Sequence, residues 1–395
     1  MPVNNAMQKT FGLKASLMLV TSLTIMSGAT IAPSLPEIAR EYGDNARSEY
    51  LSKLILTVPA LAIAVCGTFA GMLVDRFGRK NLLLFGLVLY AVAGISGYFL
   101  DDIFLILVGR ALLGVSVALV MTIATTLVGD YFVGPERHKF LGYQGGFMAL
   151  GGMVFVGFGG LLADFHWRFP FLLYLFSLLV LPLAAYYLYE PVNKEERLEI
   201  REEATPDYPK PIVNLIYITV FLYMVVFYMI PVQIPFLLED IGVKKYLLAG
   251  LAIAIGTIAA AVTAFFYQKM RARLHYSKIY AIGFILIGIG YGIVSISYTY
   301  LTVISGLIVS GFGVGALMPN ANLWLLSVVP EKIRGKAVGK ITAALFLGQF
   351  FSPILVQPLV KMYNLHLVFG AVGIFTALMG IGYAFSRFRD QEMAD

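Results

Sequence analysis

Twelve apolar stretches recur along the 395-residue chain, and this pattern restricts the possible folds more than any other feature. A helix of ~20 apolar residues is long enough to cross the hydrocarbon core of a bilayer. Inside lipid every backbone polar group must be satisfied within the protein, which a helix does along its own length. The sequence therefore predicts an all-α membrane protein with 12 transmembrane helices, at 14–36, 50–71, 82–100, 103–128, 140–163, 169–189, 212–237, 246–267, 278–297, 300–326, 341–362 and 366–386.

The composition agrees with this prediction and excludes several other classes of protein. Hydrophobic residues make up 59% of the chain and charged residues 13%, so lipid-facing surfaces as well as a core can be apolar. Cys66 is the single cysteine, and the four histidines are scattered, so we expect no disulfide, metal site or cofactor. The spans lack facing acid–base pairs and a phosphate-binding loop, which argues against a membrane enzyme or an ATP-driven pump.

Basic residues are distributed unevenly between the predicted loops. Of the 29 lysines and arginines, 21 fall in alternate loops and in both tails, seven fall on the opposite side, and Arg110 falls inside a span. Cytoplasmic loops carry the excess of positive charge, so both termini are predicted to be cytoplasmic. The same loop bias explains the net charge of +6 without any nucleic-acid partner. Lys53 is counted among the seven outer residues.

A proline-rich, charged segment at 190–211 interrupts the pattern of spans. We interpret it as a cytoplasmic linker that joins an N-terminal six-helix bundle (1–189) to a C-terminal six-helix bundle (212–395). A faint repeat supports this division, because Gly109 to Gly114 and Gly306 to Gly311 occupy corresponding positions in the two halves.

The turn between the second and third spans carries the most particular motif, Gly71-Met-Leu-Val-Asp75-Arg76-Phe-Gly78-Arg79-Lys80. Gly71 would let two backbones approach, and Gly78 would permit a turn with positive φ. The motif closely resembles the signature loop of the major facilitator superfamily of secondary transporters. That resemblance implies a conformational latch between helices 2 and 4, formed by Asp75, Arg79 and Asp130, with Arg76 in the same loop. Such a latch would favour the outward-facing state.

Two ionisable residues are candidates for proton coupling. Arg110 lies about seven residues inside span 4, where a charge is costly unless it faces a partner or a wet cavity, so we expect it to face the central cavity. The alternative for Arg110 is an arginine that snorkels to the outer interface. Its context resembles the span-4 arginine motif of the family, which is implicated in proton coupling. Glu37 follows Pro33 and Pro36 at the end of span 1, and could equally be an exposed loop acid.

Polar residues inside otherwise apolar spans are candidates for a substrate cavity at the midplane. Some of them would instead hydrogen-bond one helix to another. The candidates are Thr24, Ser27, Gln144, Tyr223, Tyr228, Gln233, Asn320, Asn322, Gln349 and Gln357.

Span 5 is rich in glycine, and its last pair, Gly159-Gly160, resembles the end of the antiporter motif of drug exporters. Phe155-Val156 stand where that motif has Gly-Pro. The resemblance implies a proton-coupled exporter of small amphipathic organic molecules in the bacterial inner membrane, working as a monomer. The alternatives are an exporter of one metabolite, such as a siderophore, sugar or organic acid, and a uniporter or importer of the same fold.

Overall fold

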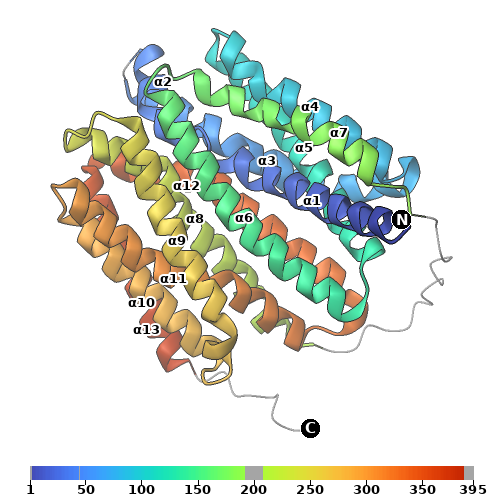
Figure 1. Ribbon diagram of the computed structural model, residues 1–395. Coiled ribbons are helices and arrows are strands. Elements are labelled where there is room, and N and C mark those ends of the chain that lie inside the picture. Colours follow the sequence, from blue (N-terminus) through green and yellow to red (C-terminus); the bar gives the residue numbers. More distant parts are fainter. Residues whose placement is uncertain (1, 44, 192–207, 387–395) are drawn as a thin grey trace.

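The computed structural model describes residues 2–43, 45–191 and 208–386, and every regular element among these residues is a helix (Figure 1). The first part of the chain contains α1 (Pro2–Ala29), η1 (Ala32–Ser34), α2 (Leu35–Glu41), α3 (Ala46–Phe77), α4 (Lys80–Phe99), α5 (Ile103–Tyr131), α6 (Gly134–Ala163), η2 (Phe169–Leu175) and α7 (Phe176–Tyr187). The second part contains α8 (Lys210–Asp240), α9 (Tyr246–Arg271), α10 (Tyr276–Ser295), α11 (Tyr300–Val328), η3 (Glu331–Ile333), α12 (Arg334–Met362) and α13 (Leu365–Phe385).

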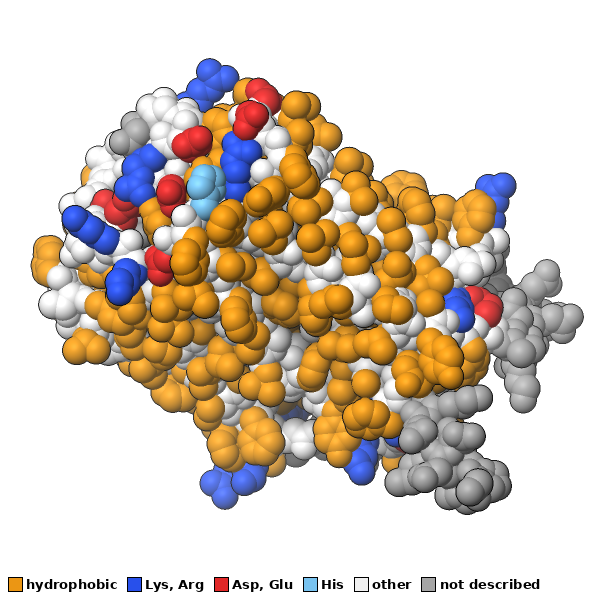
Figure 2. Space-filling model, turned by 45° about the horizontal axis from the view of Figure 1, so that its top comes forward, with side chains coloured by type: hydrophobic (Ala, Val, Ile, Leu, Met, Phe, Trp, Pro, Cys, Tyr) orange, Lys and Arg blue, Asp and Glu red, His pale blue; other side chains and the backbone are white. Residues whose placement is uncertain are grey.

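Twelve helical segments of the described chain are long and apolar enough to cross a membrane, which confirms the predicted spans. The first span, Phe11–Glu41, is built from α1, η1 and α2, and the sixth, Phe169–Tyr187, from η2 and α7. Proline explains the break in the first span, because Pro33 and Pro36 lack the N–H that a continuous helix requires. Figure 2 shows a broad hydrophobic band on the visible face, with charged side chains gathered towards its ends.

The helices pack most extensively within each half of the chain. In the first half α5 packs against α3 and α4, and in the second half α10 packs against α11 and α13 and α8 against α12. Two seams join the halves, one between α6 and α9 and the other between α3 and α12 (Figure 1). We call the end of the molecule that holds Gly78 and the end of α13 the inner end, following the predicted orientation, and the opposite end the outer end. The two-domain division stays a prediction, and most of the predicted linker lies outside the described residues.

Candidate functional site: a cavity between two seams

A cavity of about 470 Å³ lies between the two halves, near the middle of the spans. Helices α1, α3, α5 and α6 line it from one half, and α8, α9, α11 and α12 from the other. Its wall is mostly apolar, with Met224, Phe227 and Phe346 among the larger side chains, and its described lining contains no charged residue. A cavity of this size and character suits a small organic molecule held mainly by apolar contact.

Five of the ten predicted cavity residues line this space, and they come from both halves. These are Thr24, Ser27, Tyr223, Tyr228 and Gln349. The Tyr228 hydroxyl donates a 2.8 Å hydrogen bond to the carbonyl oxygen of Gly28, so it joins α8 to α1 at the cavity wall. Whether these five residues bind substrate stays a prediction.

The other five candidates for the cavity are not part of its lining, and the structure places them elsewhere. Asn320 is fully buried between helices, donating to the carbonyl oxygen of Tyr276 and accepting from the Tyr267 hydroxyl. Gln357 bonds to α3 at the outer end, and Gln233 is fully buried in α8. Gln144 and Asn322 are partly exposed on α6 and α11. A polar residue in a span can serve helix packing as readily as a cavity.

Arg110 is fully buried inside the first half, so it is not an arginine that snorkels to the interface. Its Nε donates to the carbonyl oxygen of Ile55 and its Nη2 to that of Ser27, each at 2.8 Å. The guanidinium lies over the Tyr174 ring, 5.1 Å from its centroid. Arg110 itself is not part of the cavity lining, which corrects the prediction that it faces the cavity, but Ser27 connects the two.

Glu37 lies on α2 at the outer end, close to the start of α9. It interacts electrostatically with Tyr246 of the second half, whose hydroxyl also accepts a hydrogen bond from Arg40. Arg40 is in addition paired with Glu239 of α8. The prolines of the first span therefore direct a charged segment across the outer end of the molecule. A role for Glu37 in proton coupling stays a prediction.

The signature motif is mostly helical, because α3 continues to Phe77 and only Gly78 and Arg79 form the turn. Gly78 has φ +79°, which confirms the predicted positive-φ turn. A Cβ at Gly71 would meet nothing within 4 Å, so the expected close backbone approach at Gly71 is wrong for this structure. Arg76 lies over the ring of Phe77 on the same helix, 5.3 Å from its centroid.

Two of the three predicted latch residues form an ion pair. Arg79 Nε lies 2.6 Å from Asp130 Oδ2, which joins the turn after α3 to the end of α5. The side chain of Asp75 lies outside the described part of the structure. The Arg79–Asp130 pair is formed in a structure whose two halves are packed together at the outer end. The pair alone therefore does not define an outward-open form. Its role as a latch stays a prediction.

Glu190 is a partner of the signature turn that was not identified from the sequence. Its carboxylate accepts hydrogen bonds from the backbone N–H groups of Arg79 and Lys80, at 2.8 and 2.7 Å. These groups begin α4 and have no acceptor within the helix, so Glu190 acts as a cap supplied from the end of α7. Glu190 lies 110 residues after Lys80 in the sequence, so the residues around the turn do not indicate that it is the partner.

We expect Glu190→Ala to lower the stability of the folded protein by ~1 kcal/mol, the usual cost of losing a helix cap. The measurement is the melting temperature of the purified protein in detergent. Glu331→Ala is the matched control, because that exposed carboxylate pairs with Arg334 within three residues of the chain. An unchanged melting temperature in Glu190→Ala would show that water caps α4 equally well.

Glycine residues hold the outer part of the α6–α9 seam together. A Cβ on Gly160 would lie 2.6 Å from the carbonyl oxygen of Tyr246, and one on Gly250 would lie 2.7 Å from that of Val156. Gly159 is packed as tightly against the carbonyl oxygen of Thr30 in its own half. The Asp164 carboxylate also accepts a 2.6 Å hydrogen bond from the backbone N–H of Tyr246. The outer ends of α6 and α9 are therefore closed against each other.

The inner part of the same seam is separated. An apolar groove of about 670 Å³ lies there, lined on α6 by Gly142, Gly145 and Gly146 and on α9 by Phe265 and Phe266. A Cβ on any of these three glycines would meet nothing within 4 Å. Thr257 lines both this groove and the central cavity. The arrangement closes the seam at one end of the molecule and leaves space at the other.

A family model described as Major Facilitator Superfamily matches residues 17–274 and 216–393. The chain belongs to the major facilitator superfamily. Solved structures agree with this assignment at the level of the fold: a D-xylose–proton symporter superposes with TM-score 0.74 at 16% identity, covering 95% of this chain and 98% of that one. A bacterial homologue of the lysosomal transporter Spinster superposes with TM-score 0.76 at 14% identity, covering 94% and 95%.

Among curated proteins, drug-resistance proteins share part of the sequence. Multidrug resistance protein 1 of Bacillus subtilis is 32% identical over 147 residues, 37% of this chain and 38% of that protein. The quinolone resistance protein NorA of Staphylococcus aureus is 27% identical over 143 residues, 36% of each chain. These matches span little more than a third of the relatives. An uncharacterized transporter of Methanocaldococcus jannaschii is 23% identical over 92% of this chain and 95% of its own. The chain is thus a multi-pass member of this superfamily, with partial relatives among drug-resistance proteins.

Proposed function

We propose that this protein exports small amphipathic organic molecules by alternating access, driven by protons. The observation that carries the proposal is the uncharged, mostly apolar cavity between the two halves, bordered by one seam that is packed at its outer end and spaced at its inner end. Substrate would enter the cavity from the inner end and leave after the outer ends separate. The partial relatives are named as drug-resistance proteins, and removal of a drug from the cell would give resistance, which supports export as the direction.

The lining favours amphipathic substrates over anionic metabolites. An anionic substrate would need a cation in the cavity wall, but Arg110 is not part of the lining and its guanidinium already donates to two carbonyl groups. Thr24, Tyr223 and Gln349 supply neutral hydrogen-bonding groups among apolar ones. We further propose that the protein works as a monomer in a cytoplasmic membrane with both termini inside, binds no nucleic acid and catalyses no reaction.

Protons would act through charged residues outside the cavity. Glu37 stays a candidate because it lies at the contact between the halves, where its surroundings change if the outer ends part. Arg110 keeps its proton at any working pH, so it would not carry a proton itself. Its role would be to keep α3 and α1 in register beside the cavity.

A bulky residue in the cavity wall tests whether substrates pass through this space. We expect Met148→Trp, on the α6 side of the wall, to reduce efflux of large planar dyes by roughly tenfold or more and that of small ones less. Leu179→Trp, at an exposed position on α7, is the control. Efflux is measured in cells with matched expression. Equal loss for dyes of all sizes would indicate general damage and not a filled cavity.

A further inference from the structure

Lys53 is a buried cation that the proposed transport route does not use. The sequence predicts it to be one of the basic residues on the outer side, but it lies in the second turn of α3 with its side chain fully buried. Among the described residues, Lys53 and Arg110 are the two charged side chains withdrawn completely from water. Removing an ammonium group from water is costly unless opposite charge and hydrogen bonds replace the lost hydration.

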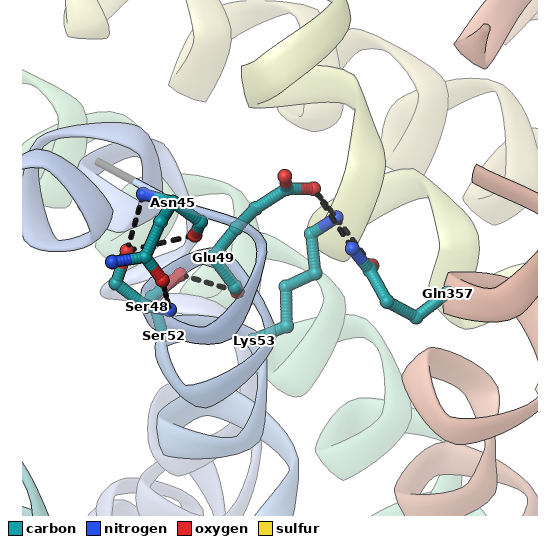
Figure 3. Close-up of polar contacts among 6 residues, drawn as sticks. All are labelled: Asn45, Ser48, Glu49, Ser52, Lys53 and Gln357. Carbon is teal, nitrogen blue, oxygen red and sulfur yellow. Dashed lines mark hydrogen bonds and ion pairs between the residues drawn. The ribbon is translucent and has the colours of Figure 1, made fainter. Parts of the chain in front are cut away.

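The groups that replace the lost hydration of Lys53 come from both halves of the protein (Figure 3). Within α3, Nζ of Lys53 pairs with the carboxylate of Glu49, one helical turn earlier. From α12, Oε1 of Gln357 accepts a 2.8 Å hydrogen bond from the same Nζ, and Nε2 of Gln357 donates to Glu49 at 3.1 Å. From α8, the ring of Phe236 lies 4.5 Å from Nζ. Three side chains therefore form a closed triangle across the α3–α12 seam.

The start of α3 is built to hold this triangle in place. Asn45 accepts hydrogen bonds from the N–H groups of Arg47 and Ser48, and Ser48 Oγ accepts one from the N–H of Asn45. This capping box fixes the first turn of the helix immediately before Glu49 (Figure 3). Glu49 and Lys53 are then one turn apart on one face of α3 and point toward Gln357.

Other polar contacts between the halves at the outer end are more exposed. Arg40 and Glu239 pair across the halves with about 46% and 34% of their side chains accessible, so solvent screens them. Asp240 lies near Glu49 and Lys53 and adds a second carboxylate to the surroundings, and His366 lies near Asp240. Lys53 is buried and less screened by solvent than these groups. It therefore loses the most stabilising interaction energy if the halves separate and no new partner replaces Gln357.

We propose that Glu49, Lys53 and Gln357 form an outer gate that holds the outer end shut and is broken each time the cavity opens outward. This proposal rests on alternating access as proposed above. The opening step separates Gln357 from Lys53 and Glu49 and exposes the lysine to water. The Glu49–Lys53 pair within α3 persists, so the two charges stay compensated in the open form. The gate acts at the α3–α12 seam, while Gly160 and Gly250 close the α6–α9 seam.

Gln357→Leu isolates the link between the halves, because it leaves the Glu49–Lys53 pair intact. Accessibility is read with a single cysteine in place of Ala60, which lines the cavity about 10 Å along α3 from Lys53 at ~1.5 Å per residue, in a Cys66→Ser background. A membrane-impermeant maleimide is added to intact cells and, separately, to inverted vesicles. We expect Gln357→Leu to speed labelling in intact cells by roughly threefold or more, with slower or unchanged labelling in inverted vesicles.

Arg168→Gln is the matched control, since Arg168 pairs with Asp101 at the outer end but within one half. It should leave both labelling rates unchanged. Lys53→Met is a second gate variant, expected to act in the same direction as Gln357→Leu. If both gate variants fold, as judged by expression and melting temperature, and label like the parent, the gate proposal is wrong. The labelling needs no substrate, so the gate proposal can fail while the export proposal stands. Faster labelling only in inverted vesicles would place the gate at the cytoplasmic end and so contradict an outer gate.

Discussion

Arg110→Lys should reduce proton-driven transport to below a tenth of the parent rate. The planar guanidinium of Arg110 donates to the carbonyl oxygens of Ile55 and Ser27 at the same time. A lysine keeps the charge but has no rigid fork, so it does not hold both acceptors. Because Ser27 lines the cavity, the loss of its tether would disturb the wall itself. Transport is measured as uptake into inverted vesicles under an imposed pH gradient.

Arg110→Ala should be at least as severe, since it removes the guanidinium donor from two buried carbonyl groups and leaves that of Ser27 with the long 3.5 Å hydrogen bond from the Tyr174 hydroxyl. A buried group without a partner costs about 1–3 kcal/mol. Expression and melting temperature separate a folding defect from a transport defect. Arg168→Lys is the matched control, because Arg168 also donates to a carbonyl group, that of Tyr98, but at the partly exposed outer end. If Arg110→Lys folds and transports like the parent, Arg110 has no part in the mechanism.

Gly250→Val should abolish transport by preventing the outer end from closing. A Cβ at Gly250 already lies 2.7 Å from the carbonyl oxygen of Val156 on the opposite half, and valine adds two further methyl groups. Backbone atoms on the two helices cannot give way as a flexible side chain can, so the seam must open. We expect transport near background and faster outside labelling of a cysteine at position 60.

The matched control is Gly157→Ala on the facing helix, since a Cβ there meets nothing within 4 Å. It should keep most of the parent's transport. Gly250→Ala should lie between the two, because one methyl group requires a smaller shift. Parent-like transport by Gly250→Val would mean that the packed outer seam is not a state through which the protein works.

The fold was predictable because its main determinant is local. A span of ~20 apolar residues can be recognised from its own sequence, without knowledge of the helices that it packs against. The twelve predicted spans are confirmed. The turn at Gly78 was equally local, since one residue with positive φ suffices to end α3. The length of α3 could not be predicted in the same way. Asp75 and Arg76 are charged residues typical of a loop, although the helix continues through them to Phe77.

The candidate site was harder to predict because its members are distant in sequence. Gln357 and Asn320 have the same signal, a polar amide in an apolar span, yet one meets Lys53 of the other half and the other bonds to Tyr267 of its own half. Lys53 lies near the end of a span, where a lysine usually reaches water. Nothing in the neighbouring sequence shows that Gln357, 304 residues away, provides a buried partner.

Transport by the purified protein in liposomes, across an imposed pH gradient, tests the central claim most directly. The probe is an amphipathic fluorescent dye, and the side with fewer protons stands for the cytoplasm. The account predicts that dye moves toward the side with more protons, that collapsing the gradient with a protonophore stops this accumulation, and that protons move in the opposite direction. Dye flux that is equal with and without the gradient would contradict proton-driven export and indicate a uniporter of the same fold.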